Sequence, residues 1–211
     1  MRQTFLSPFV GLVLLAAIGW SASAGATTVH PFSLDELIYV ADRIVVGQVL
    51  TTEARFTPDG GAIVTTVELE VDQVLKGAPV DGVLDVRVLG GETGGFALHV
   101  EGAPRFDAGE RTLLFLEEGV YGPEVLGWAQ GKLRLEWNPD AGETFAHRRV
   151  VIGEDTTADW MPAEGLSAAA LADTIRLRVR AGHVPPYRDI PGLQPHKRAA
   201  FRDHWGLEVD R

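Results

Sequence analysis

The sequence predicts a mainly β protein, either an antiparallel barrel or a sandwich, with a short helix before the strands and a helical extension after them. Three observations support this fold class. Roughly six to eight short runs of apolar and β-branched residues lie between residues 44 and 152, separated by turns that contain Gly, Pro, Asp or Asn. A helix-capping pattern precedes these runs, and apolar residues at helical spacing follow them. One run also contains a phase slip that is typical of a β-bulge.

Residues 31–43, PFSLDELIYVADR, predict a short amphipathic helix. Ser33 is followed three residues later by Glu36, the spacing of a capping box, in which each side chain accepts a hydrogen bond from a backbone N–H group of the other residue. The apolar residues share one helical face: Leu34, Leu37, Ile38 and Ala41. We therefore expect this face to pack on the strands that follow.

The predicted strands are, in chain order, residues 44–56, 62–77, 83–89, 96–102, 110–119, 124–137 and 144–153. Within the second strand, three apolar residues alternate with acidic ones: Val67, Leu69 and Val71. The next apolar residue, Val74, is one place out of phase, which indicates a bulge. A bulge bends a long strand far enough to serve both sides of a small barrel. A closed or nearly closed barrel is therefore favoured over a flat sheet.

The chain after the last predicted strand begins with a loop, which we expect over residues 154–165, and continues as a helix. Ser167 is suited to cap the start of this helix, Leu166 and Leu171 form a hydrophobic staple, and Gly182 ends it. The buried stripe of the helix is expected to consist of Leu171, Ile175 and Val179.

Residues 183–195 are rich in proline and predict an extended connector. Residues 196–206 predict a last short helix that lays Phe201 and Trp205 on the body of the protein.

Residues 171–211 hold eight Lys and Arg against five Asp and Glu, whereas the whole chain has a formal charge of −10. This acidity argues against nucleic acid and anionic membranes as partners. The basic tail is expected to fold back onto the acidic body. The alternative is a separate docking surface for an acidic partner.

The N-terminal residues predict export. A basic start, an uncharged apolar stretch and small residues around Ala24 and Ala26 indicate a signal peptide over residues 1–26, cleaved after one of these two alanines. No later segment is long and apolar enough to span a bilayer. The mature protein is therefore expected to be secreted or periplasmic, with a barrel domain over residues 27–153 and a helical extension over residues 154–211.

The residue inventory argues against several kinds of active site. The chain has no cysteine. The only serines after the predicted signal peptide, Ser33 and Ser167, are expected to cap helices, so a serine or cysteine nucleophile is disfavoured. The six histidines show no metal-ligand spacing such as H-E-x-x-H. The sequence therefore assigns no catalytic residue, no metal site and no cofactor.

The stretch GGETGG, residues 90–95, is the candidate binding loop. It lacks the G-K-[ST] ending of a P-loop, and the residues after it alternate like a strand, whereas a dinucleotide fingerprint opens a helix. One interpretation is a flexible hairpin, and the other is a loop whose backbone N–H groups and carboxylate face one ligand. The candidate ligand-binding residues are Gly90, Gly91, Glu92, Thr93, Gly94, Gly95 and His99.

Residues 41–116 resemble the modules of tissue inhibitors of metalloproteinases (TIMPs) and netrins, which use an OB-fold barrel. The matching segments are ADRIVVGQV after a short helix, a long strand that ends in VDQVLKG, and DAGERTLLFL. Residues 41–137 also resemble secreted bacterial proteins of unknown function that share LKG, a glycine-rich loop, GAPRFDAGE, LLFL and GWAQGKLRL in this order. The resemblance implies a small antiparallel OB-like β-barrel. Those inhibitors chelate the zinc of their target through an N-terminal cysteine, which this chain lacks, so no site residue carries over.

Two classes of function follow from these expectations. The first is a noncatalytic exported binding module that contacts a protein, such as a protease, or a glycan through GGETGG and residues 54–62. The second is a hydrolase of the cell envelope that uses carboxylates, with Glu92, His99 and Glu101 as its reactive group. A purely structural envelope protein is the background alternative.

Overall fold

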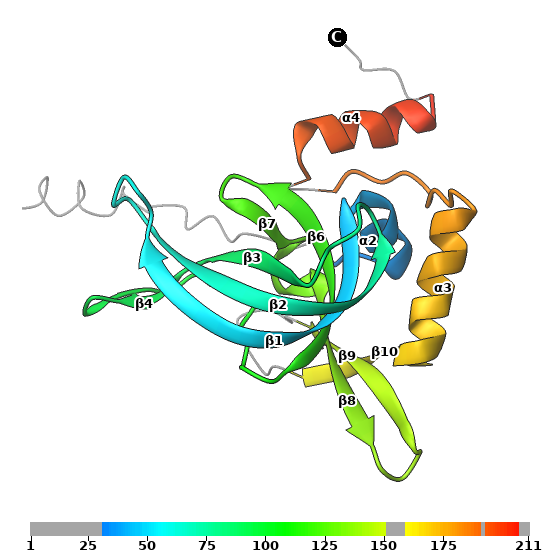
Figure 1. Ribbon diagram of the computed structural model, residues 1–211. Coiled ribbons are helices and arrows are strands. Elements are labelled where there is room, and N and C mark those ends of the chain that lie inside the picture. The colour runs from blue at the N-terminus through cyan, green and yellow to red at the C-terminus, as the bar shows by residue number, and fades with distance from the viewer. Residues whose placement is uncertain (1–30, 151–158, 191–192, 207–211) are drawn as a thin grey trace, which may run out of the picture. The chain divides into compact units, whose positions relative to one another are not determined.

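The computed structural model describes residues 31–150, 159–190 and 193–206, and this part of the chain is mainly β with helices near both ends (Figure 1). Its main sheet is mixed and has eight strands in the order β1-β2-β3-β7-β6-β8-β9-β10. These strands are β1 (Arg43–Phe56), β2 (Ile63–Lys76), β3 (Val83–Leu89), β6 (Arg111–Gly119), β7 (Gly122–Val125), β8 (Lys132–Asn138), β9 (Glu143–Val150) and β10 (Asp159–Ser167).

A separate two-stranded sheet and four helices complete the described elements. The small sheet consists of β4 (Gly91–Thr93) and β5 (Phe96–Leu98). The helices are α2 (Leu34–Val40), the 3-10 helix η1 (Trp128–Gly131), α3 (Ala168–Arg180) and α4 (Pro195–His204). No helix in the described ranges has the length and apolar character needed to cross a bilayer. The predicted signal peptide lies outside the described residues.

Helix α2 confirms the predicted capping box. The Ser33 hydroxyl accepts a hydrogen bond from the Glu36 N–H group at 3.3 Å, and the Glu36 carboxylate accepts one from the Ser33 N–H group at 2.7 Å. The predicted apolar face is buried, and its residues are Leu34, Leu37, Ile38 and Ala41. These side chains join a cluster that contains Ile44 of β1 and Phe115 of β6, so the helix packs on the sheet as expected.

The long ribbon of β1 and β2 contains the predicted bulge. The pairs on either side of it are Gly47 with Val71 and Val46 with Gln73. Asp72 is therefore the extra residue on β2, in the interval where the apolar pattern slips. The strands approach closely here, because a Cβ on Gly47 would lie 2.3 Å from the Glu70 carbonyl oxygen. Glycine is thus required where the ribbon bends.

Strand β1 pairs with β2 along one edge and with β6 along the other, which bends five strands into a partial ring in the order β1-β2-β3-β7-β6. The expectation of an antiparallel arrangement needs one correction, since β3 and β7 are parallel where Arg87 pairs with Glu124. A ring with an odd number of strands cannot alternate in direction at every pairing, so one pair has to be parallel. The sheet is mixed for this reason.

The sheet separates two apolar clusters. The inner cluster faces the inside of the partial ring and includes Val45, Val67, Leu69, Val86 and Leu114. The outer cluster joins the opposite face of the sheet to helices α2, α3 and α4, and it includes Ile44, Leu113, Phe115, Leu171 and Phe201. Neighbouring residues of β1 and β6 alternate between the clusters, as strand geometry requires. Strand β2 contributes Leu69 to the inner cluster and, beyond the bulge, Leu75 to the outer one.

The prediction of a loop over residues 154–165 is wrong from residue 159 onward, where strand β10 begins. Residues 154–158 lie outside the described residues. The backbone of β10 pairs antiparallel with β9, with Asp159 opposite Val150 and Pro162 opposite His147. Such pairing uses main-chain groups and needs no alternation of apolar residues, which is the pattern from which strands are predicted. Ser167 then caps α3, and Gly182 follows its end at φ +60°, as predicted.

The basic tail folds back onto the acidic body, as the charge distribution predicts. The ion pairs that join them are Arg178 with Asp35, Arg188 with Glu36 and Lys197 with Asp42. Phe201 is fully buried as expected, but Trp205 is 46% exposed. The prediction for Trp205 is wrong because this residue is the C-cap of α4, where the helical face ends. Its indole N–H group donates instead to the Pro185 carbonyl oxygen of the connector, at 3.1 Å.

Candidate ligand-binding site

The GGETGG stretch forms a hairpin that leaves the end of β3. Gly90 and Gly91 have φ angles of 107° and 134°, in the region that favours glycine. A Cβ on Gly91 would lie 2.4 Å from the Thr65 hydroxyl oxygen, so this position also needs glycine for close approach. Gly94 and Gly95, at φ 57° and 80°, form the two-residue turn between β4 and β5. The stretch is therefore a hairpin, and this part of the first interpretation is confirmed.

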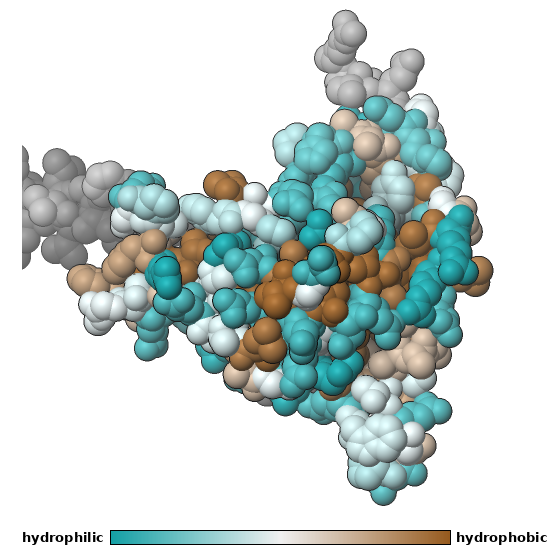
Figure 2. Space-filling model, viewed as in Figure 1, coloured by the Kyte–Doolittle hydropathy of each residue, from teal (hydrophilic) through white to brown (hydrophobic). Residues whose placement is uncertain are grey.

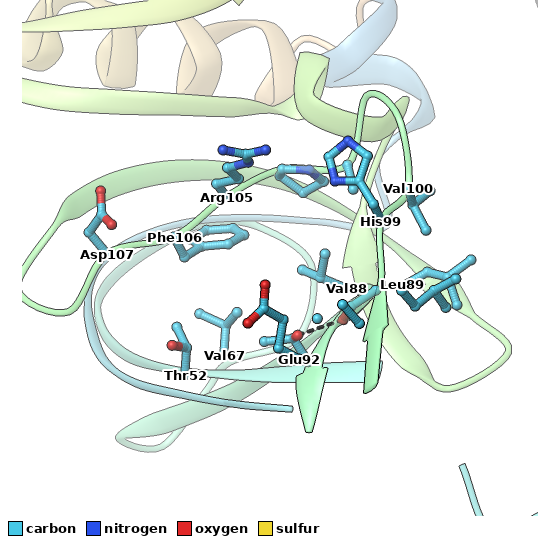
Figure 3. Close-up of a pocket in the computed structure, with 17 residues that line it drawn as sticks. Thr52, Val67, Val88, Leu89, Glu92, His99, Val100, Arg105, Phe106 and Asp107 are labelled. Atoms are coloured by element: carbon cyan, nitrogen blue, oxygen red, sulfur yellow. Dashed lines mark hydrogen bonds between the residues drawn. The ribbon is translucent and has the colours of Figure 1, made fainter. Parts of the chain in front are cut away.

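A pocket of about 450 Å³ lies beside this hairpin (Figure 3). Its walls come from β1, β2, the end of β3, the hairpin, and the segment that runs from β5 to residue 107. The predicted binding residues that line the pocket are Gly90, Gly91, Glu92 and His99. The predicted residues outside its lining are Thr93, Gly94 and Gly95, because the turn of the hairpin extends beyond the pocket.

The floor of the pocket is apolar. Val67 and Val88 line it and belong to the inner cluster, and Phe106 lines it and packs against that cluster. Side chains of a strand alternate between its two faces, so the residues that fill the ring also line its open end. The pocket is thus the place where the inner core reaches the surface.

Charged side chains stand around this floor. Figure 3 shows the Glu92 carboxylate and the Phe106 ring directed toward one another across the pocket, with His99 and Arg105 on the far side from Glu92. Neither the Glu92 carboxylate nor the Arg105 guanidinium forms a hydrogen bond or an ion pair with any described residue. The Thr65 hydroxyl, by contrast, donates to the Gly90 carbonyl oxygen at 2.6 Å and holds the hairpin to β2. Within the described part of the chain, no other group therefore competes with a ligand for Glu92 and Arg105.

A buried ion pair holds the wall that carries Arg105 and Phe106. Lys132 Nζ lies 2.7 Å from Glu110 Oε1, and the two side chains are 4% and 2% exposed. The Lys132 ammonium also donates to the Arg105 carbonyl oxygen and lies 4.3 Å from the centroid of the Phe106 ring. Burial lowers the pKa of Lys132, and the Glu110 carboxylate opposes this shift. The pair fixes the position of this wall from beneath.

Sequence reasoning missed this pair and the pocket-lining residues Arg105 and Phe106. These residues lie in GAPRFDAGE and GWAQGKLRL, two motifs of the resemblance. The alternating pattern of β8, however, does not distinguish a buried charge from a solvated one. Lys132 and Glu136 both alternate with leucines along β8, yet only Lys132 is buried. The sequence carries no signal for this difference, and the structure explains it: Lys132 lies at the buried start of the strand, whereas Glu136 lies toward its exposed end.

The residues proposed for a hydrolase are only partly brought together. Glu92 and His99 line the pocket, whereas Glu101 does not. His99 Nε2 lies 3.5 Å from Glu101 Oε2, and these side chains are 70% and 74% exposed. Carboxylate catalysis relies on groups that burial and neighbours shift toward the working pH. The contact between His99 and Glu101 is exposed to water, where an interaction of this kind contributes little.

A second polar cluster lies at the C-terminal end of helix α2. Lys76 Nζ donates to the carbonyl oxygens of Ile38 and Tyr39 at 2.7 and 2.9 Å, and Lys197 Nζ donates to that of Val40 at 3.1 Å. These carbonyls have no partner within the helix, and the helix dipole favours a cation there. The cluster therefore has a structural role: it ties the end of β2 and helix α4 to helix α2.

No group of three or more His, Asp or Glu side chains in the described residues is arranged to hold a metal ion. Comparison of the chain with protein-family models, curated proteins and solved structures finds no match.

Proposed function

We propose that the chain is an exported, noncatalytic binding module, and that it contacts an extracellular or periplasmic protein or glycan through the pocket beside the β4–β5 hairpin. The observation that carries this proposal is the opening of an apolar core at the protein surface, next to charged groups that have no partner among the described residues. Concave apolar sites with a few polar groups are typical of ligand binding.

The same proposal includes an OB-like β-barrel of the kind found in TIMP and netrin modules. Its support is the pairing order of the partial ring, with β1 joined to both β2 and β6 and with one parallel pair between β3 and β7. OB-fold proteins bind ligands on one face and the loops around it. A pocket formed by the inner faces of β1 and β2 and by the hairpin after β3 fits this mode of binding.

The pocket also supports binding over catalysis. The lining residues include no serine, and the chain contains no cysteine. Of the two lining threonines, Thr65 already donates its hydroxyl proton to the Gly90 carbonyl oxygen. A nucleophilic hydroxyl must instead give its proton to an adjacent base, which a carbonyl oxygen is not. The residues around the pocket are better suited to hold a ligand than to attack one.

A single-cysteine experiment tests the proposal, because the natural chain has no thiol. Ala97→Cys places one at the pocket, and Asp140→Cys places a matched control in the β8–β9 turn. Each variant is labelled with a photoactivatable crosslinker and exposed to the extracellular fraction of the source cells. We expect a discrete adduct at position 97 and none at position 140. Equal labelling at both positions, or none at either, contradicts the proposal.

The hydrolase alternative is tested in parallel with Glu92→Gln and His99→Ala. Both variants and the unchanged protein are incubated with cell-envelope polymers, and released fragments are measured by mass spectrometry. We expect no turnover from any of the three. Turnover by the unchanged protein that disappears in Glu92→Gln would replace the binding proposal with the enzymatic one.

A further inference from the structure

The size and surface of the pocket indicate what it accommodates. Its volume of about 450 Å³ is at the small end of ligand pockets and takes one or two apolar side chains, not a long polymer. Its apolar floor is formed by the partly exposed Phe106 beside the buried side chains of Val67 and Val88. Such a floor rewards an apolar group by removing its surface from water.

The lining is poorly suited to a sugar. It contains no Trp or Tyr to stack on a sugar ring, and the charged side chains that could bind hydroxyl groups stand around the apolar floor. Its one phenylalanine, Phe106, already has the Lys132 ammonium 4.3 Å from its ring centroid. Sugar hydroxyls placed against the valine floor would lose their hydrogen bonds to water without replacement. A protein segment is therefore favoured over a glycan.

The hairpin offers an edge to an extended chain. Strand β5 pairs with β4 alone among the described strands, so its other edge carries unpaired main-chain groups. Ala97 and Leu98 of β5 line the pocket. A peptide that adds to such an edge gains main-chain hydrogen bonds and directs alternate side chains to one side, where a pocket selects them.

The end of the sheet that carries this hairpin is also apolar at its surface. Phe56 and Phe96 are 46% and 66% exposed, and their ring centroids lie 5.8 Å apart in an edge-to-face arrangement. Figure 2 shows apolar surface at this end of the sheet, beside polar side chains. These rings extend the contact area beyond the pocket itself.

The charge of the site determines which charged residues a bound protein segment should carry beside its apolar side chain. Two carboxylates, Glu92 and Asp107, line the pocket against one arginine, Arg105, and the chain as a whole has a formal charge of −10. The Glu92 carboxylate points into the pocket and has no partner among the described residues. Opposite charges across an interface steer association and favour the matching partner.

We infer that the pocket binds an extended protein segment in which an apolar side chain packs against Phe106 at the apolar floor of the pocket and an adjacent Lys or Arg pairs with Glu92. This inference rests on the proposed function and names the class of its partner. Arg105, on the far side from Glu92, is placed to donate to a carbonyl group of the segment.

Short capped peptides test this inference. The probes are the N-acetylated, C-amidated peptides Ser-Lys-Leu-Lys-Ser and Ser-Lys-Phe-Lys-Ser, with Ser-Lys-Ser-Lys-Ser and Ser-Glu-Leu-Glu-Ser as controls. Binding is followed by two-dimensional amide NMR of the full mature chain at low salt. We expect the Leu or Phe peptide to shift amide signals of residues 90–107 and to bind at least about tenfold more tightly than either control.

Two variants locate the contact. Glu92→Gln should reduce the preference for Lys over Glu in the peptide by about tenfold, whereas Glu101→Gln, which removes the same charge outside the pocket, should leave it nearly unchanged. Equal effects of the two variants would mean that only the general field of the protein acts, which would overturn the inference. Both side chains are exposed, so neither variant should disturb the fold.

The outcomes separate the two proposals. If neither apolar peptide shifts the pocket signals, or if the serine peptide binds equally well, the peptide inference is wrong. If chitotetraose or cellotetraose shifts these signals and the peptides do not, the partner is a glycan. In either case, a discrete adduct at Ala97→Cys still supports the proposed binding function. If no adduct forms, the proposed binding function and the peptide inference are both wrong.

Discussion

Glu36 joins the start of helix α2 to the C-terminal connector. Its carboxylate accepts hydrogen bonds from the Ser33 N–H group and from Arg188 Nη2, both at 2.7 Å. Burial raises the pKa of Glu36, but the hydrogen bonds from Arg188 and Ser33 outweigh this and hold the pKa below its usual value. One carboxylate thus caps a helix and tethers a residue 152 positions along the chain.

We expect Arg188→Gln to lower the free energy of unfolding by about 1–3 kcal/mol at neutral pH, because it leaves the Glu36 carboxylate without its charged donor. The folded pKa of Glu36 is depressed, so its contribution is present above the unfolded pKa and is lost as the pH falls through the folded value. The variant should therefore lose less stability than the unchanged protein between about pH 5 and pH 3. Urea denaturation at each pH gives the free energy of unfolding of both proteins. If the two free energies fall equally between these pH values, the prediction is wrong.

Lys76 changes stability with pH in the same direction as Glu36, but in an alkaline window. Burial lowers its pKa to about 8, the Asp42 carboxylate opposes this shift, and Lys197 adds to it. Between about pH 8 and 10.5 the folded lysine has lost its proton while the unfolded one keeps it, so the unfolded state binds more protons. Stability then rises with pH across this window.

Lys76→Arg checks this directly, because arginine does not titrate in the window. We expect the stability of the unchanged protein to rise relative to the variant from about pH 8 to 10, by at most about 1.4 kcal/mol per pH unit. The difference between the two denaturation midpoints at each pH gives the measurement, since other titrating groups cancel. A constant difference would show that the Lys76 pKa is ordinary.

At the scale of elements, the buried pair of Lys132 and Glu110 determines how β8 supports the wall of the pocket. Removing one partner leaves the other charge buried and alone, whereas replacing both by apolar residues removes both desolvation costs. We expect Glu110→Gln to lower the free energy of unfolding by about 3–5 kcal/mol, and the pair Lys132→Met with Glu110→Leu to recover most of this loss. Thermal and urea denaturation measure both.

The exposed pair of Arg134 and Glu136 on the same strand provides the control. Its atoms lie 2.9 Å apart, but the side chains are 38% and 52% exposed. Water screens such a pair, so Glu136→Gln should change stability by no more than about 1 kcal/mol. If Glu110→Gln costs no more than this control, the buried pair does not hold the wall.

The elements that the sequence predicts are those with a local signal. The capping box needs only Ser33 and Glu36, and the bulge shows itself in the slip between Val71 and Val74. Strand β10 has no such signal, because its pairing with β9 depends on main-chain groups. Trp205 follows the helical spacing, but the helix ends before its face is used.

The candidate site divides in the same way. The glycine hairpin is visible in the sequence because Gly90 and Gly91 have no substitute at their φ angles and contacts. The opposite wall is not visible, since Phe106 and Lys132 are brought together only when β6 and β8 pair. Local chemistry therefore locates one half of the pocket, and tertiary contacts supply the other half.

At the scale of the whole molecule, one sheet serves two cores with different roles. The inner cluster comes from the strands of the partial ring and reaches the surface at the pocket. The outer cluster gathers α2, α3 and α4 on the opposite face of the same strands. Because β1 and β6 contribute alternate residues to both, loss of the outer core should weaken the strands that shape the pocket.

Phe201→Ala tests this link between tail and body. Phe201 is fully buried in the outer cluster, and its ring centroid lies 5.0 Å from that of Tyr39 and 5.2 Å from that of Tyr187. We expect the substitution to lower the free energy of unfolding by about 3–5 kcal/mol, with a single unfolding transition, because tail and body share one core. The exposed Trp205→Ala should cost much less. Hydrogen exchange gives the deciding measurement: if the amides of α4 exchange far faster than those of β1 and β6 in the unchanged protein, the tail unfolds independently and the shared core does not govern stability.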